Sequence, residues 1–526
     1  MSDRFQPITM EQLTDWVFTE LEEKDSIFGI SRRSFFVPSE DDRFRVPNYD
    51  QTLETPFGVA AGPHTQMAQN IVVAWLVGAR FIELKTVQTL DELDVNKPCI
   101  DIEDEGYNVE WSQELKVHQS FDEYLRAWVL IHALHRKLGF PGDAPGMIFN
   151  MSVGYDLQGI LQPNVQWYLD VMDDASAYLG PYLDIVAQRY PEMSDVDVPA
   201  QLSNTMTLST MHGCPPEEIE QITTYLLEDR GLNTSVKCNP TLLGADRVRT
   251  IINDELGFTD VVIPDEAFGH DLKYVDAVPM FHNLKRIARR EGLTFGLKLS
   301  NTLEVENHRP TFPDDDMMYM SGRALHAVTA NLALRLSEEF RGDMLLSFAG
   351  GADAFNVTDL LRSGMTTITV CSDLLKTGGY LRMPQYLEEL NNGLDKAEAS
   401  DIADFVGKTA LGEHHYSMFA EMLTTAVLAD TGLAFGHDDA HDLSVYLCGE
   451  WDQPIPEVIR AWAVERGYDE AQAETLTTVA MRTLGRVNLR GYAQAVHSDW
   501  RYKNESFRMD HSKTSRKLGL FDCIEA

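Results

Sequence analysis

Short apolar runs alternate with amphipathic stretches through the middle of the chain. From residue 55 one unit recurs: a β-rich run that ends in Gly, Ser or Asn, followed by a stretch with helical apolar spacing. Strands that alternate with helices predict an α/β protein with a parallel sheet, and about eight such units predict a (β/α)8 TIM barrel, here over residues 55–384. The runs are TPFGVAAGP, RFIELKT, GMIFNMSVG, TMTLST, TSVKCNP, TDVVIP, FGLKLSNT, MLLSFAGG and TTITVCS.

The number of these runs is nine, one more than a barrel of eight needs. TDVVIP, residues 259–264, is the weakest strand candidate, and it opens a long connection that extends through residue 290. We therefore expect this run to be an insertion.

Helical patterns flank the expected barrel on both sides. Residues 1–54 contain MEQLTDWVFTELEEK, whose apolar spacing fits an amphipathic helix, so we expect an N-terminal helical cap. Strand-like runs stop after Tyr380, and residues 385–526 predict a helical appendage.

Composition narrows the class of protein. With 526 residues, 44% of them hydrophobic and 24% charged, the chain is typical of a globular protein with two domains. A formal net charge of -38 disfavours nucleic acid as a partner, because phosphates need a basic face. The acidic surface is interpreted as solvated, with an electrostatic role in partner docking as the alternative.

The chain shows neither a targeting signal nor a metal-binding cysteine motif. No window reaches the roughly 18 apolar residues of a membrane span, and the N-terminus MSDRFQPITMEQ lacks the pattern of a signal peptide, so we expect a cytoplasmic protein. The six cysteines show no CxxC or other metal-binding spacing within the chain.

The ends of the expected strands carry the candidate chemistry, because the C-terminal ends of barrel strands face one mouth. FGVAAGPHT, residues 57–65, ends a strand in small residues, and Lys85 with Thr86 ends the next one. FAGGADA and VCSDLLKTGG end the last two strands with glycines and a serine. Backbone N–H groups at these last two positions commonly cradle a phosphate, which predicts a phosphate-bearing cofactor.

The same motifs resemble the FMN-dependent barrels of dihydroorotate dehydrogenase and dihydropyrimidine dehydrogenase. FGVAAGPHT followed by ELKTVQTLDE is similar to that family's first flavin-binding turn and Lys-Thr strand end, and VKCNP is similar to its flavin-lysine strand. YNVEWSQE, residues 107–114, resembles the Asn-x-Glu loop that holds a pyrimidine, and LSNT resembles the strand end that meets the substrate ring. MSGRALHAVT, AGG and VCS resemble its glycine turn and phosphate strands. These matches run in order over roughly residues 55–380.

This resemblance implies an FMN-dependent oxidoreductase that reduces or oxidises a C=C or C=N bond of a nitrogen heterocycle, either a pyrimidine or a purine-like ring. It assigns substrate binding to Asn108, Glu110, Asn301 and Thr302. It assigns cofactor binding to Ala60, Ala61, Gly62, Lys85, Thr86, Asn150, Lys237, Lys298, Gly322, Gly350, Gly351, Cys371 and Ser372. Lys237 and Lys298 both stay in the set, because two lysine-bearing strands stand where the family usually has one; a lysine there stabilises the anionic reduced flavin.

The stretch TLSTMHGCPPEEIEQI, residues 207–222, lies where this family carries its catalytic acid. Aligning LST with that strand end puts Thr210 at the place of the acid, although a threonine hydroxyl is a poor proton donor. Cys214 stands just before an expected helix start, where the helix N-terminus favours a thiolate. We expect Cys214 to act as the acid with His212 assisting; the alternative is a buried or capping cysteine without a chemical role.

Over nearly its whole length, including LSTMHGCPPEEIE and KTSRKLGLFDCIEA, the chain is similar to a group named as selenate reductase subunits, although no selenate site is recognisable. Members of that group continue into a cysteine-rich iron–sulfur segment and an FAD- and NAD(P)H-binding module. The resemblance implies that electrons come from such an iron–sulfur/FAD partner or extension, and that Cys523 is the first ligand of an iron–sulfur cluster. The alternative is a non-catalytic flavin-barrel docking subunit of an iron–sulfur flavoprotein complex, and a homo- or hetero-oligomer is compatible with either reading.

Overall fold

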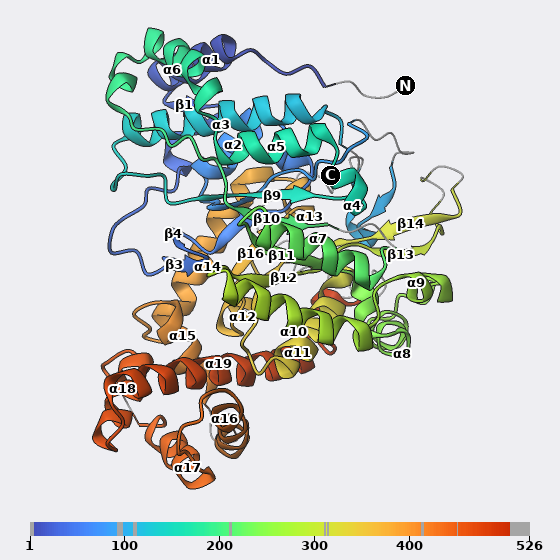
Figure 1. Cartoon of the computed structure of the whole chain (residues 1–526), viewed down its shortest axis with the longest axis vertical. Coiled ribbons are helices and arrows are strands. Elements are labelled where there is room, and N and C mark those ends of the chain that lie inside the picture. Colours follow the sequence, from blue (N-terminus) through green and yellow to red (C-terminus); the bar gives the residue numbers. More distant parts are fainter. Residues whose placement is uncertain are drawn as a thin grey trace, which may run out of the picture.

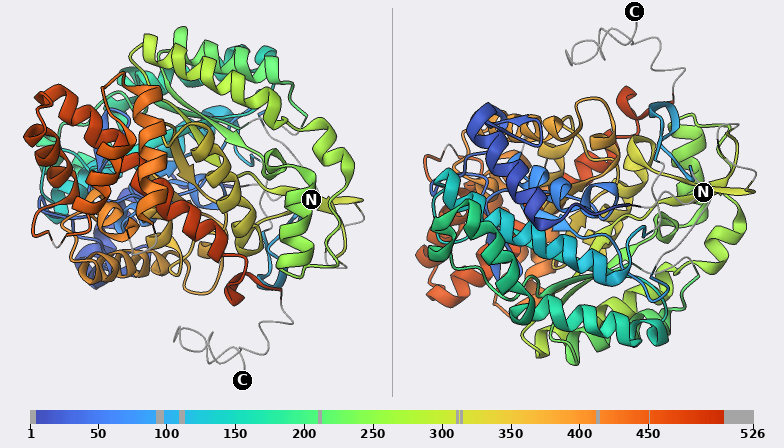
Figure 2. Two further views of the ribbon diagram at one scale, coloured as in Figure 1. Left: turned by 90° about the horizontal axis from the view of Figure 1, so that it is seen from below. Right: turned by 90° about the horizontal axis from the view of Figure 1, so that it is seen from above.

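The computed structural model describes residues 5–91, 98–108, 113–209, 213–309, 312, 315–411, 415–449 and 451–504. Parallel strands close into a (β/α)8 TIM barrel with the neighbour order β10-β11-β12-β15-β16-β5-β6-β9 (Figure 1, Figure 2). The barrel strands are β5 (Phe57–Val59), β6 (Phe81–Glu83), β9 (Ile148–Val153), β10 (Thr205–Leu208), β11 (Asn233–Cys238), β12 (Phe295–Leu299), β15 (Leu345–Phe348) and β16 (Thr367–Val370). The expected fold class is confirmed.

The insertion expected at residues 259–264 is confirmed as well, because the other eight predicted runs are the barrel strands and this one has no regular structure. It lies inside the long connection between β11 and β12. That connection contains η5 (Pro240–Leu243), α8 (Ala245–Arg249), η6 (Thr250–Glu255), α9 (Asp265–His270) and α10 (Tyr274–Arg290).

Helices surround the strands, as the alternating pattern predicted. Because they cover the outside of the barrel while side chains fill its inside, the strands are buried on both faces. The remaining barrel helices are α2 (Ala68–Leu76), α3 (Val117–Leu138), α4 (Leu157–Ile160), α5 (Pro163–Asp173), α6 (Ser176–Arg189), α7 (Pro216–Glu228), α11 (His326–Glu339), α12 (Val357–Arg362), α13 (Ser372–Leu375) and α14 (Met383–Lys396).

The N-terminal segment contributes a helix on the outside and a plug at the bottom of the barrel. Helix α1 (Met10–Lys24) coincides with the predicted run; it begins at a capping box between Thr9 and Gln12 and packs against α6. After the short pair β1 (Ser26–Ile27) and β2 (Ile30–Ser31), the hairpin of β3 (Val46–Asn48) and β4 (Gln51–Leu53) presents Tyr49 to the barrel. The Tyr49 hydroxyl lies 3.1 Å from Ser235 Oγ, and its ring lies 6.4 Å from that of Phe81.

A small second sheet lies at the opposite, C-terminal end of the barrel and is here called the lid sheet. It consists of β7 (Ile100–Asp101), β8 (Tyr107–Asn108), β13 (Leu303–Glu306) and β14 (Met317–Met320), in the order β13-β14-β7-β8. Its strands come from the connections after β6 and after β12, so two segments distant in sequence meet over the mouth.

The C-terminal helices form a tier with a core of its own (Figure 1). They are α15 (Ile402–Ala410), α16 (Tyr416–Asp430), α17 (His437–Tyr446), α18 (Ile455–Glu465) and α19 (Glu470–Ala495), followed by η9 (Trp500–Tyr502). The division expected at residue 384 falls inside α14, which packs on the barrel through Tyr386 and Phe57. The C-terminal end of α19 also packs on the barrel core through Leu489 and Tyr492.

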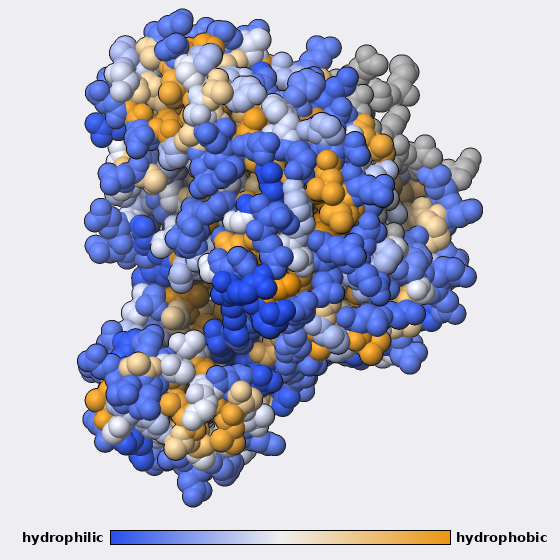
Figure 3. All heavy atoms as spheres, in the orientation of Figure 1, coloured by the Kyte–Doolittle hydropathy of each residue, from blue (hydrophilic) through white to orange (hydrophobic). Residues whose placement is uncertain are grey.

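The visible face of the molecule is largely hydrophilic, with apolar side chains scattered in small groups (Figure 3). In the described parts of the chain, each helix is either too short or too polar to cross a bilayer.

Candidate functional site

Three turns converge at the mouth of the barrel, each lined by predicted cofactor residues. A Cβ placed on Gly351, whose φ is 68°, would lie 2.4 Å from the backbone oxygen of Gly322. One placed on Gly322, at φ 76°, would lie 2.3 Å from Ile102 Cγ2 and 3.7 Å from Ser372 Cβ. Backbone lies against Gly351 and the Ile102 side chain lies against Gly322, and both residues have a positive φ, so glycine fits best at these two positions. The structure therefore brings together the loops after β14, β15 and β16.

Gly350, in the middle of these turns, is held from behind by a neutral histidine. A Cβ on Gly350 would lie 2.2 Å from Thr329 Oγ1, so this position is also closed to side chains. Burial lowers the pKa of His326 to about 4. The neutral ring can donate from Nδ1 to Gly350 O at 2.8 Å and accept at Nε2 from the Tyr492 hydroxyl at 2.5 Å. The ring of His326 also stacks on Tyr502 at 4.7 Å.

The first strand-end turn lies directly beside the last one. The backbone N–H of Ala60 donates to Val370 O at 3.0 Å, and a Cβ on Gly62 would lie 3.0 Å from Cys371 Sγ. His64 Nε2 lies 3.2 Å from Cys371 O, and burial lowers the pKa of this histidine to about 4. Ala60, Gly62 and Cys371 are thus neighbours, with Ala61 between the first two and partly exposed.

Two of the predicted lysines lie side by side inside the barrel. Lys237 on β11 and Lys298 on β12 are register partners, so their side chains point the same way. Lys298 Nζ lies 2.6 Å from Glu83 Oε1 and 3.2 Å from Ser347 Oγ, and it also contacts Thr369 Oγ1. Burial lowers the pKa of Lys298, and the ion pair with Glu83 opposes that shift.

The charge of Lys237 is less well compensated by neighbouring groups than that of Lys298. Within the part of the chain that the structure describes, it makes no hydrogen bond or ion pair. Burial lowers its pKa to about 8; Glu83 opposes the shift, and the ammonium groups of Lys298 and Lys85 add to it. The interior at the mouth therefore favours an anion or a strong hydrogen-bond acceptor next to Lys237.

Asn150 and Thr86 complete the polar lining of the barrel. Asn150 donates from Nδ2 to Thr207 Oγ1 at 2.8 Å, while its Oδ1 is buried and has no hydrogen-bond partner among the described residues. Thr86 Oγ1 lies 2.7 Å from Ser152 Oγ. Since a buried polar atom without a partner costs about 1–3 kcal/mol, Asn150 Oδ1 fits a site that receives a donor from a ligand.

The residues expected to hold the substrate belong to two elements of the mouth. Asn301 follows β12, where its backbone N–H donates to Cys238 O at 2.8 Å and its side chain donates to Asn239 Oδ1 at 3.0 Å. Thr302, partly exposed, leads into β13 of the lid sheet. Asn108 is buried on β8 of the same sheet, and Glu110 lies outside the described residues.

Cys214 lies two residues before α7, as predicted, but its thiol is not activated. Burial raises its pKa to about 11, and the carboxylates of Glu218 and Asp156 add to this effect. The expectation that a helix N-terminus favours the thiolate is therefore wrong, because burial and two acidic neighbours outweigh the helix dipole. A protonated thiol is still able to give up a proton. Thr210 and His212 lie outside the described residues, as does Cys523.

Two groups of functional interest were missed by sequence reasoning. Glu83 is an acidic residue within an apolar strand, and that position was the available signal for a buried ion pair. Asp101, Glu103 and His308 gather beside the lid sheet, with burial and Asp101 raising the pKa of Glu103 to about 8. His308 is distant in sequence from Asp101 and Glu103, so the sequence contains no sign that the three side chains meet.

A closed (β/α)8 barrel with glycine turns on its last strands and buried lysines at its mouth defines the class as a TIM-barrel protein. A family model described as "Oxidoreductase YgfK, N-terminal TIM-barrel domain" matches residues 28–418. The chain belongs to this family.

Two curated relatives share the family name. "Putative oxidoreductase YgfK" of Escherichia coli K12 is 43% identical over 425 residues, which cover 76% of this chain and 41% of the relative. The protein of the same name from Escherichia coli O157:H7 matches with the same values. The match therefore spans about two fifths of the length of these relatives, and neither name mentions selenate.

Among solved structures, the chain is similar to a ligand-free dihydroorotate dehydrogenase (DHODH) from Eimeria tenella. The TM-score is 0.44 at 14% identity, over 76% of this chain and 99% of that one.

Proposed function

We propose that this chain is the flavin-binding catalytic part of an oxidoreductase that uses FMN to reduce or oxidise a C=C or C=N bond of a nitrogen heterocycle, pyrimidine or purine-like. The observation that carries the proposal is Lys237, a lysine inside the mouth of the barrel with a pKa lowered to about 8 and no carboxylate of its own among the described residues. Such a cation suits a cofactor ring that gains negative charge on reduction.

The converging glycine turns support a phosphate-bearing cofactor at the same mouth. Gly322 and Gly351 leave backbone where side chains would otherwise stand, and Ser321 Oγ lies 3.3 Å from Ser372 Oγ, so hydroxyl and N–H donors face one place. On the first turn Gly62 brings the backbone against Cys371, while Ala60 and Ala61 are partly exposed, so a flat ring can lie against small side chains there. This donor set fits the single phosphate of FMN.

Bound FMN would supply hydride transfer to or from a ring carbon. Lys237, with Lys298 behind it, would stabilise negative charge at the flavin, while Asn150 Oδ1 would accept from an N–H donor of the bound ring. Asn301 and Thr302, with Asn108 and Glu110 from the lid side, would hold the heterocycle.

The proton that accompanies the hydride is assigned to Cys214. Its raised pKa keeps the thiol protonated at neutral pH, which is the form that a general acid needs before reaction. In this role Cys214 would deliver the proton to a ring carbon or nitrogen, with His212 and Thr210 in the preceding turn assisting.

Electrons would reach the flavin from an iron–sulfur/FAD module that reacts with NAD(P)H, either on a partner or on further parts of the protein. The relatives are longer than the shared region, which makes up about two fifths of their length, so they have room for such a module. Cys523 would then be a ligand of the first iron–sulfur cluster.

Heat release and mass spectrometry of the cofactor test the proposal first. We expect FMN at about one equivalent per chain; recovery of FAD alone, or no flavin after reconstitution with FMN, would contradict the assignment. Anaerobic titration of the reduced protein with pyrimidines, oxopurines and their dihydro forms then identifies the substrate class. Cys214→Ala should slow the oxidation of reduced flavin by substrate about 100-fold and leave flavin content unchanged.

A further inference from the structure

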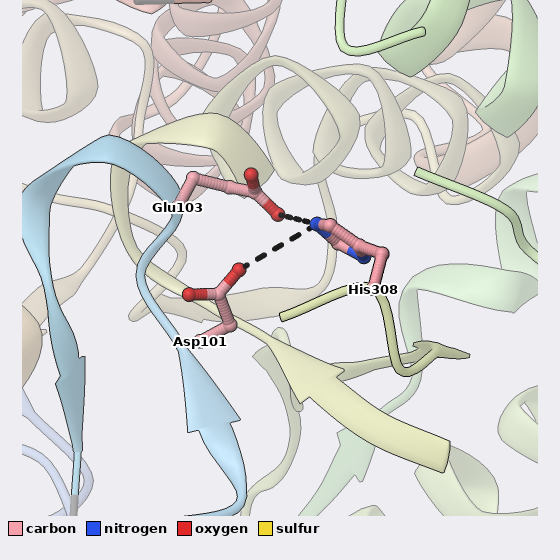
Figure 4. A group of neighbouring side chains, drawn as sticks. All are labelled: Asp101, Glu103 and His308. Carbon is pink, nitrogen blue, oxygen red and sulfur yellow. Dashed lines mark ion pairs between the residues drawn. The ribbon is translucent and has the colours of Figure 1, made fainter. Parts of the chain in front are cut away.

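Asp101, Glu103 and His308 gather beside the lid sheet, away from the lysines of the barrel interior. Asp101 ends β7 and Glu103 opens η3 (Glu103–Glu105), while His308 comes from the loop after β13. All three side chains point into one space, as Figure 4 shows. His308 Nε2 lies 3.7 Å from Glu103 Oε1 and 4.0 Å from Asp101 Oδ2.

The three facing side chains are largely buried, and two of the facing atoms lack hydrogen-bond partners. The side chains of Asp101 and Glu103 are 3% and 2% exposed, and that of His308 is 15% exposed. Glu103 Oε1 and His308 Nε2 have no hydrogen-bond partner among the described residues. Because leaving two buried polar atoms unmatched is costly, the space between them calls for a group that satisfies both.

The orientation of the imidazole identifies the kind of group. His308 Nδ1 lies 3.2 Å from Glu306 O, so Nδ1 carries the proton and donates to that carbonyl. Nε2 then presents a lone pair toward two carboxyl groups, an arrangement that is repulsive unless a proton or a metal cation lies between them. A histidine whose second nitrogen donates to a backbone carbonyl is also the usual form of a metal ligand.

Arg309 leaves this space open. It binds Asp101 Oδ2 at 3.1 Å through Nε and Glu103 Oε2 at 2.6 Å through Nη2, so Glu103 Oε1 is untouched. Asp260, 64% exposed, brings a third carboxylate, with Oδ2 at 4.0 Å from His308 Nε2. Three carboxyl groups and one guanidinium surround this space, so a divalent cation would match the two carboxylates that Arg309 does not neutralise.

We propose that Asp101, Glu103 and His308 bind one divalent transition-metal ion, with Asp260 closing over it as a fourth ligand. One imidazole with carboxylates suits Zn²⁺ or Mn²⁺, whereas Ca²⁺ and Mg²⁺ prefer oxygen alone. Tetrahedral ligands at about 2.1 Å from an ion lie about 3.4 Å apart, so the observed 3.7 and 4.0 Å need only a small contraction. The site is independent of the proposed flavin chemistry.

The ion would join three segments that are distant in sequence. β7 and the β13–β14 hairpin meet in the lid sheet, and the 259–264 segment is attached to β13 where Glu306 donates its N–H to Val262 O at 2.9 Å. Ile102, between two of the ligands, touches Gly322 of the cofactor turns. The metal would therefore fix the lid sheet next to the mouth.

Metal content and affinity of the untagged full chain test this site. After chelator treatment and gel filtration, the protein should take up one equivalent of Zn²⁺ or Mn²⁺, and competition with a chromophoric chelator should give an affinity at least 100-fold weaker in Glu103→Gln and His308→Ala. Mg²⁺ or Ca²⁺ at the same concentration should not displace the ion. His118→Ala, which removes an exposed imidazole from α3, should bind as the wild type does.

Two further measurements keep the outcome decisive if a variant folds poorly. Circular dichroism in chelator checks that each variant is folded, and Co²⁺ added to the wild type should give d–d bands without the sulfur-to-cobalt charge-transfer band that a cysteine site would produce. Uptake below a tenth of an equivalent, equal affinity in His308→Ala and His118→Ala, or a sulfur charge-transfer band would each overturn the proposal. None of these outcomes depends on whether FMN binds.

Discussion

The two ends of the barrel interior are built from the same alternation of inward-facing residues, yet the side chains at these ends differ in their contacts. At the N-terminal end Tyr49 closes the barrel, with its hydroxyl on Ser235 and its ring beside Phe81. At the C-terminal mouth the inward positions hold Lys237 without a carboxylate partner among the described residues and Asn150 with an unmatched acceptor. A closed end contributes stability, and an end with unmatched polar groups indicates where a ligand is received.

The largest effect should come from filling the turn at the mouth. Gly351→Ala places a methyl 2.4 Å from the backbone oxygen of Gly322 at a φ of 68°, so the turn has to move. We expect a loss of more than about 3 kcal/mol in stability together with nearly all bound flavin. Gly231→Ala is the matched control, because its φ is 64° but nothing lies within 4 Å of the added Cβ; it should cost about 1 kcal/mol and keep the flavin.

Flavin absorbance after gel filtration and denaturant unfolding curves measure both variants. Equal flavin content in the two would show that the glycine turns are not part of the cofactor site.

The next effect concerns the cation at the mouth. Lys237→Met should slow reduction of the bound flavin about 100-fold and lower its reduction potential, because the charge that stabilises the reduced ring is gone. Anaerobic reduction by a photochemical donor, with a reference dye for the potential, measures both quantities. Lys116→Met, at the exposed start of α3, should change neither, and a Lys237→Met protein with the wild-type potential would remove the main support for the proposed function.

The buried Lys237 also predicts that the stability of the flavin-free protein depends on pH. Its pKa is lowered to about 8 in the folded state and is about 10.5 when unfolded, so between these values the unfolded chain binds more protons. The Lys237 contribution to stability should therefore rise with pH from about 8 to 10.5. Lys237→Met should be about 1–2 kcal/mol more stable than the wild type at pH 7, with the difference shrinking toward pH 10.5.

Denaturant unfolding of both proteins at several pH values checks the direction of this stability difference. A Lys237→Met protein that is less stable at pH 7, or a difference that grows with pH, would contradict it.

The smallest effect should come from the closed end. Tyr49→Phe removes the hydrogen bond to Ser235 and keeps the ring against Phe81, so we expect a loss of about 1 kcal/mol. Flavin content and reduction rate should stay at wild-type values, as measured by absorbance and stopped flow. Loss of flavin in Tyr49→Phe would mean that the two ends are not functionally distinct.

The sequence allowed the barrel and its strand ends to be predicted because local patterns determine them. The eight strands, the irregular segment at 259–264 and the glycines at 322 and 351 each follow from residues close together in the chain. The protonation state of Cys214 could not be predicted from the sequence. Its raised pKa depends on burial and on Asp156, a residue from another loop. Asp101 and His308 likewise meet only because the lid sheet joins two connections of the barrel.

Helix α19 has a consequence for how the protein unfolds. Its first half packs into the core of the C-terminal tier, while Tyr492 near its end donates to His326, which holds Gly350. Tyr502 stacks on the same imidazole and also reaches Asn356. The backbone amides of the Gly350 turn and those of α19 should therefore exchange with solvent in one cooperative opening, and a chain cut at residue 418, where the family match ends, should lose hydrogen-exchange protection at its cofactor turns.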